Sequence, residues 1–162
     1  MDGSWAGAMG QCQFMPTSFI NYAIDFDGDG KKDIWNTIPD VLASAANYLS
    51  SSNWNNNETW GREVSILNPI DESLITVSAR KVDVSKKLST WSALGVRRLD
   101  GSELPKVDIN AYLVYPEGVN GRKYIVYENF KTILKWNRSL FFGIAVGTLS
   151  DLSLIHISEP TR

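Results

Sequence analysis

The sequence contains only one cysteine and one histidine among its 162 residues. Cys12 alone cannot form an internal disulfide, which suits a reducing compartment or an exported protein that has no disulfides. His156 lies in the last eleven residues, so we expect no histidine-based catalytic or metal site in the body of the chain. No apolar run reaches the roughly 18–20 residues of a membrane-spanning helix, and the start does not look like a signal peptide. We expect no transmembrane segment, and a mature chain that either starts upstream of Met1 or is cytoplasmic.

The sequence also lacks an excess of either charge. Sixteen basic and eighteen acidic residues are spread along the chain and give a net charge of −2. Binding to nucleic acid usually requires a clustered basic face, so the sequence offers no case for a nucleic-acid partner. The content of 43% apolar and 21% charged residues is that of an ordinary globular protein, which we expect to be monomeric.

The last eleven residues, 152–162, read LSLIHISEPTR. A transposase adapter used in DNA sequencing libraries translates to these residues in one reading frame. The alternative is a natural frayed terminus. We predict that 152–162 is an adapter-derived tail and not native, and we leave it out of the fold prediction.

The hydrophobic periodicity predicts helices towards both ends of the chain and a mixed region between them. The predicted helices are 18–24, 39–49, 84–94 (stopped by Gly95), 129–136 and 140–149. The predicted strands are 63–67, 74–79, 107–115 and 123–127, the last two forming a hairpin. We therefore predict an α+β fold with three parts: a mainly helical core in 1–60, a small α+β insertion in 61–127, and a helical return to the core in 128–151.

The acidic loop at 25–40 matches most of the EF-hand template, which is a calcium-binding loop. Asp25, Asp27, Asp29 and Asp33 fall at loop positions 1, 3, 5 and 9, and Gly30 occupies position 6, where the sharp turn requires glycine. Alternate residues of a tight loop point several oxygens at one centre, as a hard cation requires. The alternative is an acidic surface turn, because this sequence favours turns for its backbone alone.

Of the remaining ligand positions of this loop, one fits the template and one departs from it. The backbone carbonyl of Lys31 occupies position 7, but position 12 is Asn36 instead of a bidentate glutamate. Asp40, at the start of the next predicted helix, could close a longer loop. We predict Ca²⁺ bound by Asp25, Asp27, Asp29, Lys31 and Asp40, and leave open whether Asp33 or Asn36 joins them.

The segment 3–16, GSWAGAMGQCQFMP, combines small residues, two amides and aromatic side chains. Glycine lets a ligand approach the backbone, the amide of Gln13 can donate and accept hydrogen bonds, and aromatic rings can stack on sugars. By itself this composition fits a sugar or peptide groove as well as a packing corner that glycine permits.

This segment resembles the hallmark of the membrane-bound B-type lytic murein transglycosylases, glycoside hydrolase family 103. The resemblance continues through AIDFDGDGKKDIW, DVLASAANYL, TWGREV, LGVRRLDG, YPEGVNG and NFKTILKWNRS, and it covers residues 3–151. It implies a lysozyme-like helical core, an EF-hand-like calcium loop closed by Asp40, and a periplasmic protein that binds peptidoglycan glycan strands. An outer-membrane anchor would lie in an N-terminal part that precedes this chain.

The resemblance also implies four substrate-binding residues. Ser4 and Gln13 would line the active-site groove, and Tyr48 and Asn137 would face it. Two alternatives remain open, since Tyr48 could be a plain core residue and Asn137 a helix cap. Phe142 stands where some relatives have tyrosine, which would remove one hydrogen bond from the site.

The resemblance implies cleavage of the β-1,4 bond between N-acetylmuramic acid and N-acetylglucosamine, with formation of a 1,6-anhydro ring. One glutamate would act first as acid and then as base, and in the family it lies upstream of the GSWAGAMGQ segment. The glutamates of this chain are Glu58, Glu63, Glu72, Glu103, Glu117, Glu128 and Glu159. None is set in an apolar helix with a following glycine, so we assign no catalytic residue and expect an inactive C-terminal fragment.

Two other functions fit the same residues. The first is a non-catalytic, calcium-stabilised module that binds peptidoglycan. The second is a calcium-dependent sensing or structural domain with no role in sugar binding. A catalytic glutamate encoded upstream would separate the enzyme from the module, and glycan binding would separate the module from the calcium-only domain.

Overall fold

The computed structural model describes residues 4–158, with side chains as far as Ser153. Residue contacts divide the chain into two compact units, Met1–Trp54 and Asn55–Arg162. The first unit is helical, and the second combines helices with a six-stranded sheet. The predicted α+β class is therefore confirmed.

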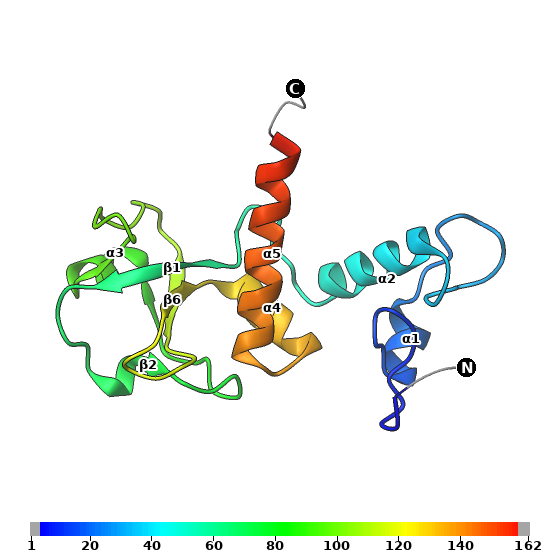
Figure 1. The fold of residues 1–162 in the computed structure, drawn as a ribbon, viewed down its shortest axis with the longest axis horizontal. Helices are drawn as coiled ribbons and strands as arrows, with labels where there is room; N and C mark the ends of the chain where they lie inside the picture. The colour runs from blue at the N-terminus through cyan, green and yellow to red at the C-terminus, as the bar shows by residue number, and fades with distance from the viewer. Residues whose placement is uncertain (1–3, 159–162) are drawn as a thin grey trace. The chain divides into compact units, whose positions relative to one another are not determined.

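The first unit contains two helices, α1 (Pro16–Tyr22) and α2 (Ile38–Ser51), joined by the acidic loop (Figure 1). Both helices have a proline in the first turn, where the missing N–H has no helical partner to lose. Asp40 adds a negative charge in the first turn of α2, which the helix dipole favours. The two helices predicted at 18–24 and 39–49 are confirmed, with ends shifted by about two residues.

Aromatic side chains hold the first unit together. Tyr48 of α2 packs between Phe14 and Tyr22, with ring centroids 5.7 and 5.0 Å away. Phe19 of α1 contacts Trp35 of the acidic loop at 5.8 Å. These contacts connect the segment before α1, both helices and the loop into one packed body.

The sheet of the second unit has the strand order β2-β5-β6-β1-β4, and β3 also pairs with β5. Its strands are β1 (Gly61–Ile66), β2 (Ile75–Thr76), β3 (Ser85–Lys87), β4 (Val96–Arg97), β5 (Asn110–Val114) and β6 (Lys123–Val126). All pairs are antiparallel except β2 with β5. The predicted hairpin is confirmed, with Leu113 of β5 opposite Ile125 of β6.

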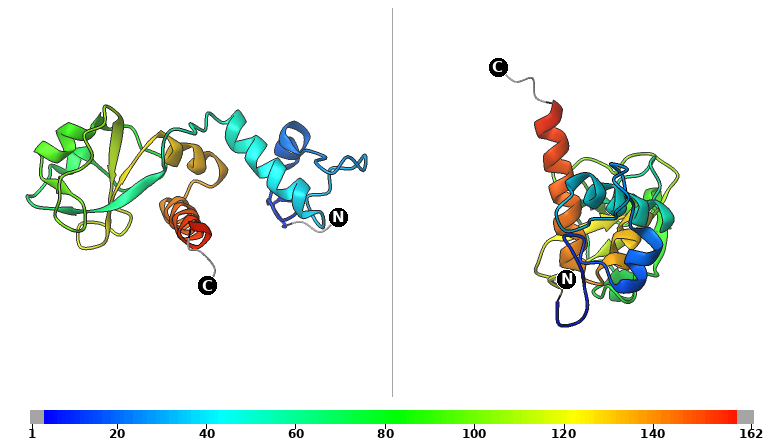
Figure 2. Two further views of the ribbon diagram at one scale, coloured as in Figure 1. Left: turned by 90° about the horizontal axis from the view of Figure 1, so that it is seen from above. Right: turned by 90° about the vertical axis from the view of Figure 1, so that its right-hand side faces the viewer.

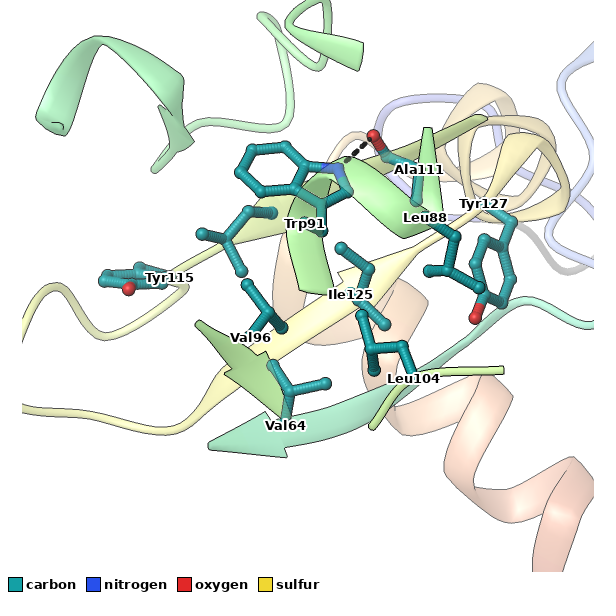
Figure 3. Packing of buried hydrophobic residues seen from close by; sticks show 10 residues of the cluster. Val64, Leu88, Trp91, Val96, Leu104, Ala111, Tyr115, Ile125 and Tyr127 are labelled. Carbon is teal, nitrogen blue, oxygen red and sulfur yellow. Dashed lines mark hydrogen bonds between the residues drawn. The ribbon is translucent and has the colours of Figure 1, made fainter. Parts of the chain in front are cut away.

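The sheet is covered on both faces. On one face, Ile125 belongs to a buried cluster with Leu88 and Trp91 of α3 (Leu88–Ala93), which also includes Leu113. The indole Nε1 of Trp91 donates a hydrogen bond of 2.9 Å to the Ala111 carbonyl (Figure 3). On the other face, the sheet meets helix α4 (Glu128–Trp136) through Tyr112, which bonds to side chains of that helix. Residues 111–115 are therefore all buried, although strict alternation would predict one exposed face.

The single helix predicted at 84–94 is wrong in its first half. Ser85–Lys87 form β3, which pairs with residues 110–112 of β5, and the helix α3 begins only at Leu88. Backbone pairing with a distant strand overrides the local helical pattern. The predicted stop is confirmed, because Gly95 has a φ of +97°. The strand predicted at 74–79 is only Ile75–Thr76, preceded by the 3₁₀ turn η1 (Glu72–Leu74).

The second unit ends with α4 and α5 (Leu140–Ser158), which lie against each other (Figure 2). Helix α5 continues through 152–158, which the sequence analysis set aside, because no glycine or proline interrupts the chain between Gly147 and Ser158. Residues 159–162 of the predicted adapter tail lie outside the described residues, and its origin stays a prediction. None of the described helices is long and apolar enough to cross a membrane.

Two glycines of α5 allow this close packing. A Cβ atom on Gly147 would lie 2.2 Å from the indole of Trp60, and one on Gly143 would lie 2.6 Å from the ring of Phe130. The Trp60 indole also donates a hydrogen bond of 2.9 Å to Asp151 in α5. These contacts tie α4 and α5 to the sheet of the second unit. The predicted return of 128–151 to the helical core stays a prediction.

Candidate functional site

Ser4 closes a small exposed loop at the start of the described chain. Its hydroxyl oxygen accepts a hydrogen bond of 3.1 Å from the Ala8 N–H, and its own N–H donates to the Ala8 carbonyl at 2.9 Å. Gly7, with a φ of +87°, completes the turn. Trp5 projects from this loop and is fully exposed. The loop therefore presents one hydroxyl and one indole ring on the surface of the first unit.

Gln13 lies in a second tight loop, closed by paired backbone bonds between Met9 and Phe14 of 2.8 and 3.0 Å. Its backbone is left-handed, with a φ of +51°, which is uncommon for a residue other than glycine. The exposed side chain donates one hydrogen bond of 2.8 Å from Nε2 to the Gly10 carbonyl. An amide can donate a second bond and accept at its oxygen, so Gln13 retains capacity for a ligand.

Tyr48 has a packing role in the first unit, because its ring lies between Phe14 and Tyr22. Its side chain is half-buried. Burial, together with the nearby Tyr22, raises the pKa of the Tyr48 phenol above its ordinary value, so the hydroxyl stays protonated at neutral pH. The alternative of a core residue is thus supported, while a role of the hydroxyl in substrate binding stays a prediction.

Asn137 belongs to the second unit, where it ends helix α4. Its backbone N–H donates to the Ile133 carbonyl at 3.3 Å, and its carbonyl accepts from Ser139 at 2.8 Å. The side chain is exposed. The alternative that Asn137 caps a helix is therefore supported at the level of the backbone, and the amide side chain is left to the surface.

The segment that carries Gln13 is bound to the acidic loop, a connection that the sequence analysis missed. Gln11 donates from its N–H to the Ile34 carbonyl at 2.9 Å and from its side chain to the Trp35 carbonyl at 2.8 Å. Gly10 lies so close that a Cβ atom would be 2.5 Å from the Ile34 carbonyl oxygen. These contacts therefore couple the conformation of the segment that carries Gln13 to that of the acidic loop. The only sequence signal was a glycine beside an amide.

Three carboxylates of the acidic loop gather at one place. Asp25, Asp27 and Asp29 each offer an oxygen within 4.8 Å of the others. Both oxygens of Asp25 also accept backbone hydrogen bonds, from Gly28 at 2.7 Å and from Gly30 at 2.8 Å. The two glycines have φ values of +77° and +87°, which allow the chain to fold around the cluster.

Asp40 lies under the loop and holds its two ends together. Its carboxylate is buried and accepts backbone hydrogen bonds from Phe26 at 2.8 Å and Asp33 at 2.9 Å. The carboxylate of Asp33 accepts instead from the N–H groups of Asn36 and Trp35, and these bonds hold the pKa of Asp33 below its usual value. The cluster of three carboxylates includes neither Asp33 nor Asp40.

The loop fits a hard cation such as Ca²⁺. Carboxylate and carbonyl oxygens are the ligands that Ca²⁺ prefers, and Asp25, Asp27 and Asp29 already converge. An ion would relieve the mutual repulsion of these three charges. Each oxygen of Asp40 has a second lone pair beyond its backbone bond. The assignment of Asp40 and of the Lys31 carbonyl as ligands stays a prediction.

No glutamate among the described residues has the setting of a general acid. A glutamate that donates a proton near neutral pH usually lies in a poorly solvated pocket. The buried polar residues of the described chain include Asp40 but no glutamate. Glu58 and Glu128 act in the fold, where Glu58 accepts a bond of 2.7 Å from the Glu128 N–H.

Comparison with known proteins gives matches along most of the chain. Residues 1–151 match the model of the Transglycosylase SLT domain family. The chain is 31% identical over 156 residues to membrane-bound lytic murein transglycosylase B of Escherichia coli (strain K12), which covers 93% of this chain and 39% of that protein.

Two solved structures illustrate the structural likeness. SltB3 from Pseudomonas aeruginosa, in complex with NAG-anhNAM-pentapeptide, has a TM-score of 0.84 and 45% identity, covering 93% of this chain and 40% of that one. The Escherichia coli lytic transglycosylase Slt35, in complex with calcium, has a TM-score of 0.74 and 28% identity, covering 98% and 48%. The chain thus spans about two fifths to one half of the length of these relatives. By the match of residues 1–151, it belongs to the Transglycosylase SLT domain family.

Proposed function

We propose that the protein cleaves the β-1,4 bond between N-acetylmuramic acid and N-acetylglucosamine in peptidoglycan and leaves a 1,6-anhydro ring on the muramoyl product. The observation that carries this proposal is the family match over residues 1–151. It is supported by the relative SltB3, which was solved with NAG-anhNAM-pentapeptide, a ligand that contains the anhydro sugar. We further propose that the protein acts in the periplasm, as a relative named membrane-bound lytic murein transglycosylase B suggests.

In the proposed reaction, a carboxylic acid protonates the glycosidic oxygen and the bond to the anomeric carbon breaks. The resulting carboxylate then takes the proton from the muramoyl 6-hydroxyl, whose oxygen bonds to the anomeric carbon and closes the ring. We assign this carboxyl group to a part of the protein outside residues 4–158, because no described glutamate is buried. Ser4, Gln13, Tyr48 and Asn137 would orient the glycan through hydroxyl and amide groups.

We also propose that Ca²⁺ binds to the acidic loop through Asp25, Asp27, Asp29, the Lys31 carbonyl and Asp40. The ion would supply positive charge that fixes the loop, without taking part in bond cleavage. Ile34 and Trp35 of this loop accept hydrogen bonds from Gln11. Calcium would therefore stabilise the segment that presents Gln13.

A non-catalytic peptidoglycan-binding module is the second candidate function. The observation that favours it is the same lack of a buried glutamate among residues 4–153, where side chains are described. Both candidates require that the chain bind glycan strands, whereas a purely calcium-dependent structural domain does not. Glycan binding is thus the first property to test.

The test is sedimentation of the purified chain with murein sacculi. We expect wild-type chain in the pellet and reduced binding by Gln13→Gly, which removes the amide but suits the left-handed backbone at this position. Gln13→Asn is the matched control, because it keeps an amide and asparagine tolerates the left-handed region. Failure of the folded wild-type chain to bind sacculi would contradict both candidates.

A further inference from the structure

The second unit has a pocket of about 550 Å³ between helix α4 and the segment that follows β2. Four of its lining residues are cations, namely Arg80, Lys131, Lys135 and Arg138. No aspartate or glutamate among the residues with described side chains lines it, although the whole chain has a net charge of −2. Positive charge is therefore concentrated at one site of a slightly acidic protein.

The order of residues along α4 explains part of this concentration. Lys131, Leu134 and Lys135 follow the spacing i, i+3 and i+4, which places them on one face of the helix, and Arg138 comes two residues after α4 ends at Trp136. Leu134 is almost completely buried, as is Val82 from the opposite segment. The pocket thus has an apolar floor and a cationic rim.

Part of the rim charge has no internal partner. Lys131 forms an ion pair of 3.2 Å with Glu128 and donates a hydrogen bond of 3.0 Å to the Tyr112 hydroxyl. Burial lowers the pKa of Lys131, but these two partners together raise it above its usual value, so it stays charged. Among the described residues, no ion pair joins Arg80 or Arg138 to a carboxylate. At least these two guanidinium groups are available to an anionic ligand.

We propose that this cationic pocket binds the carboxylate groups of the peptide attached to the muramoyl residues of peptidoglycan. The inference rests on the proposed function. N-acetylated sugars carry no charge, and the lactyl carboxyl group of the muramoyl residue is neutral once the peptide is attached as an amide. The remaining anions of such a substrate are the peptide carboxylates.

The chemistry of the pocket fits a peptide better than a small inorganic anion. The planar fork of arginine pairs with a carboxylate through two parallel hydrogen bonds. The apolar floor formed by Val82 and Leu134 can accept methyl and methylene groups of short aliphatic residues. A free phosphate ion has no apolar part and would gain nothing from that floor.

The pocket also begins next to a proposed glycan contact. Arg138 follows Asn137 directly in the chain, so their Cα atoms are about 3.8 Å apart. Asn137 ends α4 with its side chain exposed. A peptide that extends from a sugar bound by Asn137 would therefore lie next to Arg138 of the cationic rim.

The experiment is isothermal titration calorimetry of the chain with two ligands. One is N-acetylglucosaminyl-anhydromuramic acid with its lactyl carboxyl group capped as a methylamide, so that it is neutral as in the intact substrate, and the other is the same disaccharide with an attached pentapeptide. We expect the peptide to increase affinity in the wild-type chain. The double variant Arg80→Gln/Arg138→Gln should reduce affinity for the peptide-bearing ligand about tenfold, or about 1.4 kcal/mol, and leave the peptide-free ligand unaffected. The matched control is Lys106→Gln, an exposed cation of the same unit outside the pocket, which should change neither affinity. Circular dichroism checks that each variant is folded.

Several outcomes separate this inference from the proposed function. If the peptide-free disaccharide binds but the peptide adds no affinity, or the double variant keeps the full gain, the pocket inference is wrong and the function stands. If no disaccharide binds while free pentapeptide binds in a pocket-dependent way, the pocket inference stands and the proposed function fails. Displacement of the peptide by inorganic phosphate as readily as by a soluble dicarboxylate would overturn the inference, because the pocket would then accept any anion.

Discussion

Gly10→Ala tests the contact between the segment that carries Gln13 and Ile34 of the acidic loop. Gly10 has a φ of +61°, and left-handed backbone costs an alanine about 1–2 kcal/mol. The new Cβ atom would also lie 2.5 Å from the Ile34 carbonyl oxygen and 2.6 Å from its Cγ1 atom, and such overpacking costs about 1–3 kcal/mol. We therefore expect the free energy of unfolding to fall by about 2–5 kcal/mol.

Gly7→Ala provides a matched control. Gly7 also has a positive φ, of +87°, but a Cβ atom there would meet no atom within 4 Å. Only the backbone contribution of about 1–2 kcal/mol should be lost. The difference between the two variants therefore measures the contact with Ile34.

Urea denaturation of the whole chain gives the free energy of unfolding for both variants. Hydrogen exchange adds a local measurement, because the Gln11 N–H donates to the Ile34 carbonyl and should exchange faster only in Gly10→Ala. Equal losses of stability in the two variants, with unchanged exchange at Gln11, would show that the groove segment and the acidic loop do not pack as described.

Three further perturbations have expected outcomes. At a Ca²⁺ concentration about a hundredfold above its Kd, removal by EDTA should lower the free energy of unfolding by about 2.7 kcal/mol, and Asp27→Asn should abolish this effect; an unchanged melting temperature would contradict calcium binding. Gly147→Ala, whose Cβ would lie 2.2 Å from the Trp60 indole, should cost about 1–3 kcal/mol in thermal unfolding, and a neutral result would contradict the close packing of α5. Hydrogen bonds from Ser73 lower the pKa of Asp71 below its usual value, so the contribution of Asp71 to stability should be present above about pH 4 and lost as the pH falls through its folded-state pKa. Asp71→Asn should therefore lower the free energy of unfolding at pH 7 but not at a pH where Asp71 is protonated, and an equal loss at both pH values would refute this.

The sequence predicted those elements whose signals are local. Hydrophobic periodicity located α1 and α2, and Gly95 located the end of α3. Alternating apolar residues in 107–115, followed by a turn and a second short strand at 123–127, located the hairpin of β5 and β6. Each signal acts within a few residues, so it does not depend on the rest of the fold.

The elements that the sequence missed depend on distant partners. Ser85–Lys87 form a strand only because β5 lies beside them, and Val96–Arg97 pair with β1, about 30 residues earlier in the chain. The burial of Tyr112 on the second face of the sheet likewise depends on α4. No local pattern in these residues records such contacts.

In the candidate site, too, the sequence predicted the features that are local and missed those that depend on distant residues. Sequence spacing alone predicted the aspartates that converge, because Asp25, Asp27 and Asp29 belong to one tight loop. It did not predict that Asp40 holds the ends of that loop through the N–H groups of Phe26 and Asp33. That role follows from where α2 begins relative to the loop, which is a tertiary property.

The most direct test of the account is mass spectrometry of the soluble products from murein sacculi. We predict that the chain by itself sediments with sacculi but releases no 1,6-anhydro-muropeptides, whereas the gene product that contains this chain and a catalytic carboxyl group releases them. Release of these products by the chain alone at an enzymatic rate would contradict the account. It would assign the catalytic role to one of the exposed or half-buried glutamates of residues 4–153.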